Sequence, residues 1–206
     1  VEGGALELVN LTPELLARRR QLKHFTQGAL TRTDSPSDLA VNGEGFFQVK
    51  NPQNGRVYVT RRGDFRIDAA GYLVSERGLR LQGYCAPEWS VVGDLQIDLQ
   101  GVPDITDPNA TFVCFSIVRD GYTCVQMSDG TEFSRGRVLL QNFREPFLLR
   151  AVGGGLYGNI AAAVPCDLAA PGAFGLGSIE SSALELPSEP EQLILPPRDG
   201  FRFMIS

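Results

Sequence analysis

Residues 25–83 read FTQGALTRTDSPSDLAVNGEGFFQVKNPQNGRVYVTRRGDFRIDAAGYLVSERGLRLQG, and this stretch decides the fold class. Short apolar runs alternate in it with turn residues such as Asn42-Gly43, which is the pattern of β-hairpins. The predicted strands are 39–41, then 46–49 and 56–59 around the loop 51–55, then 65–67 and 72–74 around the turn 68–71. The sequence therefore predicts a mainly β protein, built as a compact and irregular domain of hairpins.

A further hairpin is predicted in the second half of the chain. Strands 112–118 and 122–127 flank Asp120-Gly121, which reads as a two-residue turn. That register would pair Ile117 with Cys124. The run 112–118 is apolar on both faces, so we expect it to be a central core strand. Another short strand is expected at 137–140.

Four cysteines stand at positions 85, 114, 124 and 166, and none of them belongs to a CxxC pair. The spacing therefore gives no zinc motif. In the predicted register, Cys114 and Cys124 point to opposite faces of the hairpin, so a disulfide between them would need a different register. We expect all four cysteines to be buried thiols.

The two ends of the chain differ from the middle. Thr12 as N-cap and Pro13 at the first helical position predict a short helix over 11–24. Prolines at 187, 190, 196 and 197 forbid a long helix at the other end, although Ser188 and Glu191 permit one helical turn. The expected organisation is an N-terminal arm with a short helix (1–30), a β-rich globular domain (31–186) and a proline-rich C-terminal tail (187–206).

Composition narrows the possible partners. The 206 residues carry a formal net charge of −5, which leaves no broad basic field for nucleic acid. Glycine (23) and proline (13) together make 36 of the 206 residues, well above their usual combined share of about 12%. They lie between apolar runs, as in turn-rich β proteins. No apolar stretch reaches the roughly 18 residues of a membrane span, and the first ten residues show no signal peptide.

No constellation of catalytic residues emerges from the sequence. The single histidine, His24, has no serine, cysteine or aspartate partner at a known spacing. The carboxylate pairs Asp64/Asp68 and Asp94/Asp98 sit beside glycine turns, where aspartate stabilises turns by local hydrogen bonds. Gly43-Glu44-Gly45 lacks the third glycine of a dinucleotide fingerprint, and Gly153–Gly155 lacks the Lys-Ser/Thr of a phosphate loop. We therefore expect no enzymatic activity, no cofactor and no metal.

Several short motifs, in one order, resemble the segment shared by bacterial flagellar basal-body rod and hook proteins. They are FTQGAL (25–30), SDLAV (37–41), GEGFFQV (43–49), RGDF (62–65), AAGYLV (69–74), IVRDGYT (117–123), GRVLLQNF (136–143), GGLY (154–157), PGAFGLGSI (171–179) and ALE (183–185). The residues expected to have a structural role in this pattern are Phe25, Gln27, Gly28, Leu39, Gly43, Gly45, Phe46, Phe47, Gly63, Phe65, Gly71, Asn142, Phe143, Leu156, Tyr157 and Gly177.

The resemblance implies a β-domain carried on a coiled coil made by the two chain ends. The chain departs from that pattern at both ends. No Asn-rich opening helix precedes Val1, and the proline-rich tail stands where a long amphipathic helix is expected. The chain is thus identified as a divergent member, or a fragment, that lacks the terminal helices.

Two functions remain open at this point. The first is a structural subunit of the flagellar rod or hook, or its globular portion. It would be exported by the flagellar secretion machinery to the basal body, in the periplasm or outside the cell, and would pack against other axial subunits or copies of itself. The second is a divergent relative that does not polymerise and acts as a binding or accessory module outside the cytoplasm.

The sequence also predicts the centre of the core and the state of the isolated chain. Most of the core centre should come from Phe46, Phe47, Val49, Phe65, Ile67, Leu73, Phe115 and Ile117. Without the long terminal helices, residues 1–206 should be monomeric or weakly associated.

Overall fold

The computed structural model describes residue 25 and residues 27–86, 89–99, 102–104 and 107–186. These residues form sixteen strands and two short 3-10 helices, so the prediction of a mainly β protein is confirmed. The predicted helix 11–24, with His24, and the proline-rich tail 187–206 lie outside the described residues. The division into arm, domain and tail stays a prediction.

The elements follow one another in short steps along the chain. They are β1 Leu30–Arg32, β2 Leu39–Asn42, β3 Phe46–Lys50, β4 Val57–Thr60, β5 Arg66–Ile67, β6 Leu73–Val74, β7 Arg80–Cys85, β8 Val92–Asp94, β9 Phe112–Ile117, β10 Tyr122–Met127, β11 Glu132–Val138, β12 Leu140–Gln141, η1 Pro146–Leu148, β13 Arg150–Gly153, β14 Leu156–Gly158, η2 Ile160–Ala163, β15 Ser178–Ser181 and β16 Ala183–Glu185.

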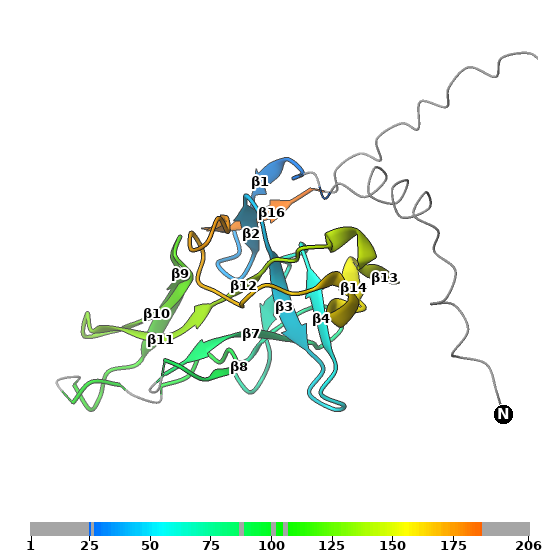
Figure 1. Cartoon of the computed structure of the whole chain (residues 1–206). Helices are drawn as coiled ribbons and strands as arrows, with labels where there is room; N and C mark the ends of the chain where they lie inside the picture. Colours follow the sequence, from blue (N-terminus) through cyan, green and yellow to red (C-terminus); the bar gives the residue numbers. More distant parts are fainter. Residues whose placement is uncertain (1–24, 26, 87–88, 100–101, 105–106, 187–206) are drawn as a thin grey trace, which may run out of the picture.

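Twelve strands make one curled sheet, and two ribbons complete the fold (Figure 1). The main path through the sheet runs β13-β14-β4-β3-β7-β11-β10-β9, while β5, β6, β8 and β12 pair beside it. One ribbon pairs β2 with β15, and the other pairs β1 with β16. The strands nearest the two ends of the described chain are therefore hydrogen-bonded to each other.

The two hairpins predicted in the first half of the chain are confirmed. Strands β3 and β4 are antiparallel around the loop 51–55, where Gly55 adopts φ +70° and donates its N–H to the carbonyl of Asn51 at 2.9 Å. Strands β5 and β6 are joined through Asp68, whose carboxylate accepts the N–H groups of Ala70 and Tyr72 at 2.9 Å each. Local turn chemistry thus sets both connections.

The predicted register of the β9–β10 hairpin is wrong by one residue. Val118 donates its N–H to the carbonyl of Tyr122 at 3.0 Å, so the loop has three residues and ends at Gly121, which has φ +91°. Ile117 consequently pairs with Thr123, and Cys124 pairs with Ser116. Cys114 and Cys124 therefore share a face, contrary to the prediction, because side-chain direction alternates with every residue.

The prediction that 112–118 is a central core strand is also wrong. Strand β9 is the last strand of the main path and pairs only with β10 among the described strands. Phe112 is 45% exposed and Val113 is 55% exposed, whereas Ile117 at the other end of the strand is buried. An apolar run shows that a strand has apolar surface, but it does not show on which side of a sheet that surface lies.

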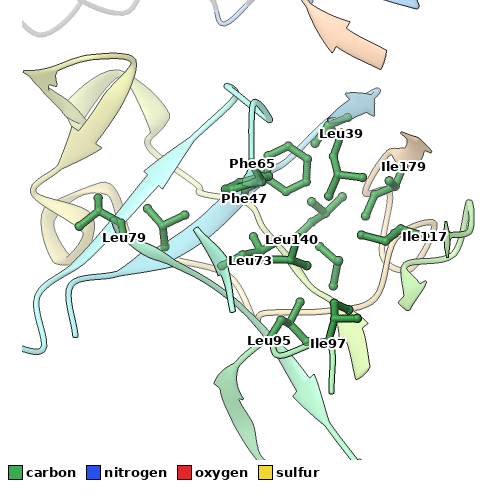
Figure 2. Packing of buried hydrophobic residues seen from close by; sticks show 14 of the residues in the cluster. Leu39, Phe47, Phe65, Leu73, Leu79, Leu95, Ile97, Ile117, Leu140 and Ile179 are labelled. Carbon is green, nitrogen blue, oxygen red and sulfur yellow. The ribbon is translucent and has the colours of Figure 1, made fainter. Parts of the chain in front are cut away.

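Two apolar clusters lie on opposite faces of β3, because successive side chains of a strand point in opposite directions. The larger cluster contains Phe47, whose ring meets that of Phe65 edge to face with centroids 5.4 Å apart (Figure 2). The smaller cluster contains Phe46. The predicted core residues Phe46, Phe47, Val49, Phe65, Leu73 and Ile117 are buried.

Two predicted core residues and the cysteines need correction. Ile67 is 38% exposed, because β5 begins only at Arg66 and the alternation does not extend back to Phe65. Phe115 is half-buried and packs at the margin of the larger cluster. The cysteines are free thiols, but Cys114 and Cys166 are exposed and Cys85 and Cys124 are half-buried. Cys114 is exposed because it lies on the edge strand β9.

Candidate functional site: the junction of the terminal strands

The two segments that enter and leave the domain run side by side. Strands β1 and β16 are antiparallel, with Leu30 opposite Glu185 and Arg32 opposite Ala183 (Figure 1). The N–H of Leu186 extends this ladder by donating to the carbonyl of Ala29 at 2.8 Å. Both segments therefore leave the domain at one place, which we call the junction (residues 27–32, 41–45, 61 and 183–186).

Arg61 holds the junction together. Its guanidinium forms an ion pair with Glu185, with Nε and Oε2 2.8 Å apart, and donates to the carbonyl oxygens of Gly43 at 2.8 Å, Gly45 at 2.5 Å and Val41 at 3.2 Å. Glu185 uses its other oxygen to accept the N–H of Gly28 at 2.7 Å. A planar guanidinium with five donors suits this task, because it can bond a carboxylate and several carbonyls at once.

Gln27 and Gly28 complete the junction from the N-terminal side. The amide of Gln27 donates to the carbonyl of Val41 at 3.2 Å and accepts the N–H of Gly43 at 2.8 Å. A Cβ atom on Gly28 would overlap the carbonyl oxygen of Leu186. Glycine at position 28 therefore lets the two terminal segments approach each other.

An aromatic cluster lies beside the junction. The Phe25 ring packs edge to face on Phe46, with centroids 4.9 Å apart, and on Tyr157, with centroids 5.1 Å apart. Phe143 meets Phe46 at 5.8 Å. Burial raises the pKa of the Tyr157 hydroxyl above its ordinary value. These rings come from four separate parts of the chain. The cluster therefore connects the N-terminal segment to β3, to β14 and to Phe143, which lies shortly before η1.

The motif glycines mark places where two backbones nearly touch. A Cβ on Gly63 would overlap the carbonyl oxygen of Leu39, which itself is fully buried, and one on Gly177 would overlap that of Asn42. Gly43 and Gly45 both have φ +117°, a region that L side chains rarely adopt. Their unusual backbone directs the carbonyls of both residues toward Arg61.

The remaining motif residues support the frame around the junction. Gly71 has φ +86° in the turn between β5 and β6, and Leu156 is buried in the larger cluster. The side chain of Asn142 accepts the N–H of Phe143 at 2.8 Å. The structure thus brings Phe25, Gln27, Gly28, Gly43, Gly45, Phe46, Phe143 and Tyr157 to the junction or its aromatic cluster, whereas Leu39, Phe47, Gly63, Phe65, Gly71 and Leu156 lie in the body of the domain.

Sequence reasoning did not single out Arg61 and Glu185 as site residues. Arg61 directly precedes the motif RGDF, and Glu185 ends the motif ALE. Their sequence separation hides the pairing, since Glu185 follows Arg61 by 124 positions. No local sequence signal marks this pair, because the burial of the Glu185 carboxylate is known only from the folded chain.

The carboxylate pairs considered for chemistry each have structural contacts. Asp64 pairs with Arg62, and Asp68 caps its own turn. Asp94 accepts from Arg80 and Gln82 at 2.9 and 2.8 Å, while Asp98 pairs with Arg135 at 2.7 Å. Among the described residues, no group of three or more His, Cys, Asp or Glu side chains is placed to hold a metal ion. Within the same residues, no helix has the length and apolar character needed to cross a membrane.

Comparison with known proteins finds similar sequences among flagellar proteins. Residues 40–125 match the family described as the flagellar hook protein FlgE/F/G D1 domain. The chain is 32% identical to the flagellar basal-body rod protein FlgG of Buchnera aphidicola subsp. Baizongia pistaciae over 164 residues, which are 79% of this chain and 55% of that protein. This chain belongs to the flagellar rod and hook protein family.

Two further relatives of the family show how the similarity is distributed. The rod protein FlgG of Caulobacter vibrioides is 33% identical over 176 residues, covering 82% of this chain and 58% of that protein. The hook protein FlgE of Rhizobium meliloti is 42% identical over 83 residues, which are 40% of this chain and 20% of the hook protein. The chain thus spans a little over half the length of the rod proteins that it matches.

Proposed function

We propose that this chain is a structural subunit of the bacterial flagellar rod or hook, or the globular portion of one, and that it contributes to the axial structure used for motility. The observation that carries the proposal is the junction. A domain that fixes its entering and leaving segments side by side is suited to stand on a shaft built from those segments. The similarity to rod and hook proteins supports the same function.

The proposal includes partners and location. The chain would be exported by the flagellar secretion machinery, would reside in the basal body or hook, and would contact other axial subunits or copies of itself. We expect no catalytic activity, because Asp64, Asp68, Asp94 and Asp98 are engaged in turns and ion pairs. Nothing in the comparisons favours the alternative of an accessory module.

The test is to purify hook–basal bodies from the bacterium that encodes the chain and to look for it by mass spectrometry and immunogold labelling. We expect the chain to co-purify and the labels to fall on the rod or hook. A chain that is secreted but absent from purified basal bodies would favour the accessory module instead. A chain that stays in the cytoplasm would overturn both.

The junction allows a sharper form of the same test. Arg61→Met removes the guanidinium from three carbonyls and a carboxylate, whereas Arg62→Met removes an exposed one from Asp64. Expressed in a deletion strain, Arg61→Met should restore swimming poorly, and Arg62→Met should restore it nearly fully. Equal rescue of swimming by both variants would show that assembly does not depend on the Arg61 contacts at the junction.

A further inference from the structure

The main sheet ends in two strands whose outer sides pair with no described strand. These are β13 at one end of the path and β9 at the other. All four residues of β13 are exposed, with Val152 at 46%, and the first three residues of β9 are exposed. Monomeric proteins prevent edge-to-edge pairing of such strands with lysine, proline or inward-pointing charges, and β9 carries none of these.

The strand directions allow these two edges to pair with each other between copies. Every neighbouring pair along the eight-strand path is antiparallel, so β13 and β9 run in opposite directions. A second copy in the same orientation would therefore place its β13 antiparallel to β9 of the first. The antiparallel pattern of the sheet would continue across the contact.

Charge distinguishes one end of β9 from the other. Asp107 and Asp129 lie in the loops at the Phe112 end, which are joined by the N–H of Asp107 donating to Asp129 at 2.9 Å, and Glu132 begins β11 at the same end. Segments 99–118 and 120–134 contain no lysine or arginine. The Ile117 end continues into Arg119 and Asp120, which are already ion-paired with Glu180 at 2.7 Å and with Arg137 at 3.9 Å. The Phe112 end of this edge is therefore acidic, whereas the charges at the Ile117 end compensate each other.

The β13 edge carries arginines at the corresponding ends. Arg150 begins the strand and has no ion-pair partner among the described residues. The guanidinium of Arg77 lies against the turn Gly153–Gly155, where a Cβ on Gly154 would be 2.9 Å from it. In this corner Arg62 is paired with Asp64 and Glu76, while Arg77 has no carboxylate within 4.0 Å among the described residues. An antiparallel contact would bring Arg77 to the acidic loops, and it would bring Arg150 to the Ile117 end of β9.

We propose that the β13 edge of one copy pairs with the β9 edge of the next copy, head to tail. This inference rests on the proposed function, because it names the lateral contact between subunits of one axial assembly. A contact between two different surfaces leaves a free surface at each end of a dimer, so repeating it builds a ring if the rotation closes and an open helical array if it does not. Four residues of β13 form a short ladder, and the contact becomes populated when subunits are already held at high local concentration.

The native Cys114 on β9 makes the proposal testable by disulfide trapping. In a full chain carrying Cys85→Ser, Cys124→Ser and Cys166→Ser, the variant Val152→Cys places a second thiol on β13. Mild oxidation at high protein concentration should give a ladder of dimers, trimers and larger species on a non-reducing gel. The control Val91→Cys, at a residue that is 59% exposed in the bend before β8, should give a several-fold lower yield of these species.

Charge reversal tests the orientation of the contact. Arg77→Glu should lower the yield of the ladder several-fold, and adding Glu132→Arg should restore it. Circular dichroism verifies that each variant is folded. Equal yields for Val152→Cys and Val91→Cys would overturn the proposal. A product limited to dimers that also forms with Cys114 alone would overturn it too, because it would show symmetric pairing of two β9 strands.

The outcome separates this inference from the proposed function. Presence in purified basal bodies without a ladder would leave the function standing and remove the edge contact. A ladder from a chain that never enters basal bodies would support the contact and remove the function.

Discussion

Single aromatic residues decide much of the stability of this domain. Phe65 is 3% exposed and stacks edge to face on Phe47. Phe65→Ala should lower the free energy of unfolding by about 3–5 kcal/mol, since it removes a buried ring and leaves a cavity. Urea denaturation measures this, with Phe174→Ala as control because that ring is 91% exposed. A loss below about 1 kcal/mol for Phe65→Ala would mean that the ring is not in the core.

Glycine 63 offers a second test at the scale of one residue. A Cβ there would overlap the carbonyl oxygen of Leu39 in the buried strand β2. Gly63→Ala should therefore cost about 3 kcal/mol or more, because two backbones would have to separate. Gly158→Ala is the matched control, since its Cβ would meet Val152 at an ordinary 3.4 Å. Similar melting temperatures for the two variants would contradict the close approach.

The sequence revealed these single residues unevenly. Phe46, Phe47 and Phe65 could be recognised as core because they occupy apolar runs next to turns. Arg61 could not, because its value depends on carbonyls and a carboxylate that only the folded chain brings to it. A local sequence pattern indicates whether a residue favours the core. A site such as the junction depends on contacts between segments that are distant in the sequence.

At the scale of elements, Arg61 attaches the terminal ribbon β1–β16 to β2 and to Gly43 and Gly45. Arg61→Met should cost about 2–3 kcal/mol, because it leaves Glu185 and several carbonyls without their charged donor. Arg62→Met should cost less than about 1 kcal/mol, since that ion pair with Asp64 is half exposed. Thermal denaturation of both variants checks the difference, and hydrogen exchange should show the extra opening in β1 and β16.

Hydrogen exchange that instead accelerates uniformly over the domain in Arg61→Met would show that the contacts of Arg61 stabilise the whole domain and not the β1–β16 ribbon alone. The double variant Arg61→Met/Glu185→Met then gives the coupling energy of the pair directly.

The contact between β7 and β8 should respond to acid. Burial alone would raise the pKa of Asp94, but hydrogen bonds from Arg80 and Gln82 outweigh burial and hold that pKa below its ordinary value. A lowered folded pKa adds stability that is present above the unfolded pKa of about 4 and is lost as pH falls through the folded value. Asp94→Asn should thus destabilise the protein near neutral pH, and the difference from wild type should shrink in acid. A difference that stays constant with pH would contradict this.

The elements themselves were predictable where turns are local. The hairpins β3–β4 and β5–β6 follow from Asn51–Gly55 and Asp68–Gly71. The β9–β10 register was not predictable from Asp120-Gly121, because a three-residue loop ending in glycine carries the same signal. The pairing of β1 with β16 was not predictable, because it joins segments far apart in the sequence and no local pattern indicates it.

For the whole molecule, the last question is what the chain does alone in solution. The β13 and β9 edges are short, and interfaces that bury less than about 1,000 Å² are mostly transient. The net charge of −5 adds mutual repulsion at low salt. Sedimentation velocity of residues 1–206 should therefore show a monomer or weak association at micromolar concentration, with association increasing as protein concentration rises. Long filaments from this chain would contradict the prediction, and they would mean that the surfaces within residues 1–206 are sufficient to build the polymer.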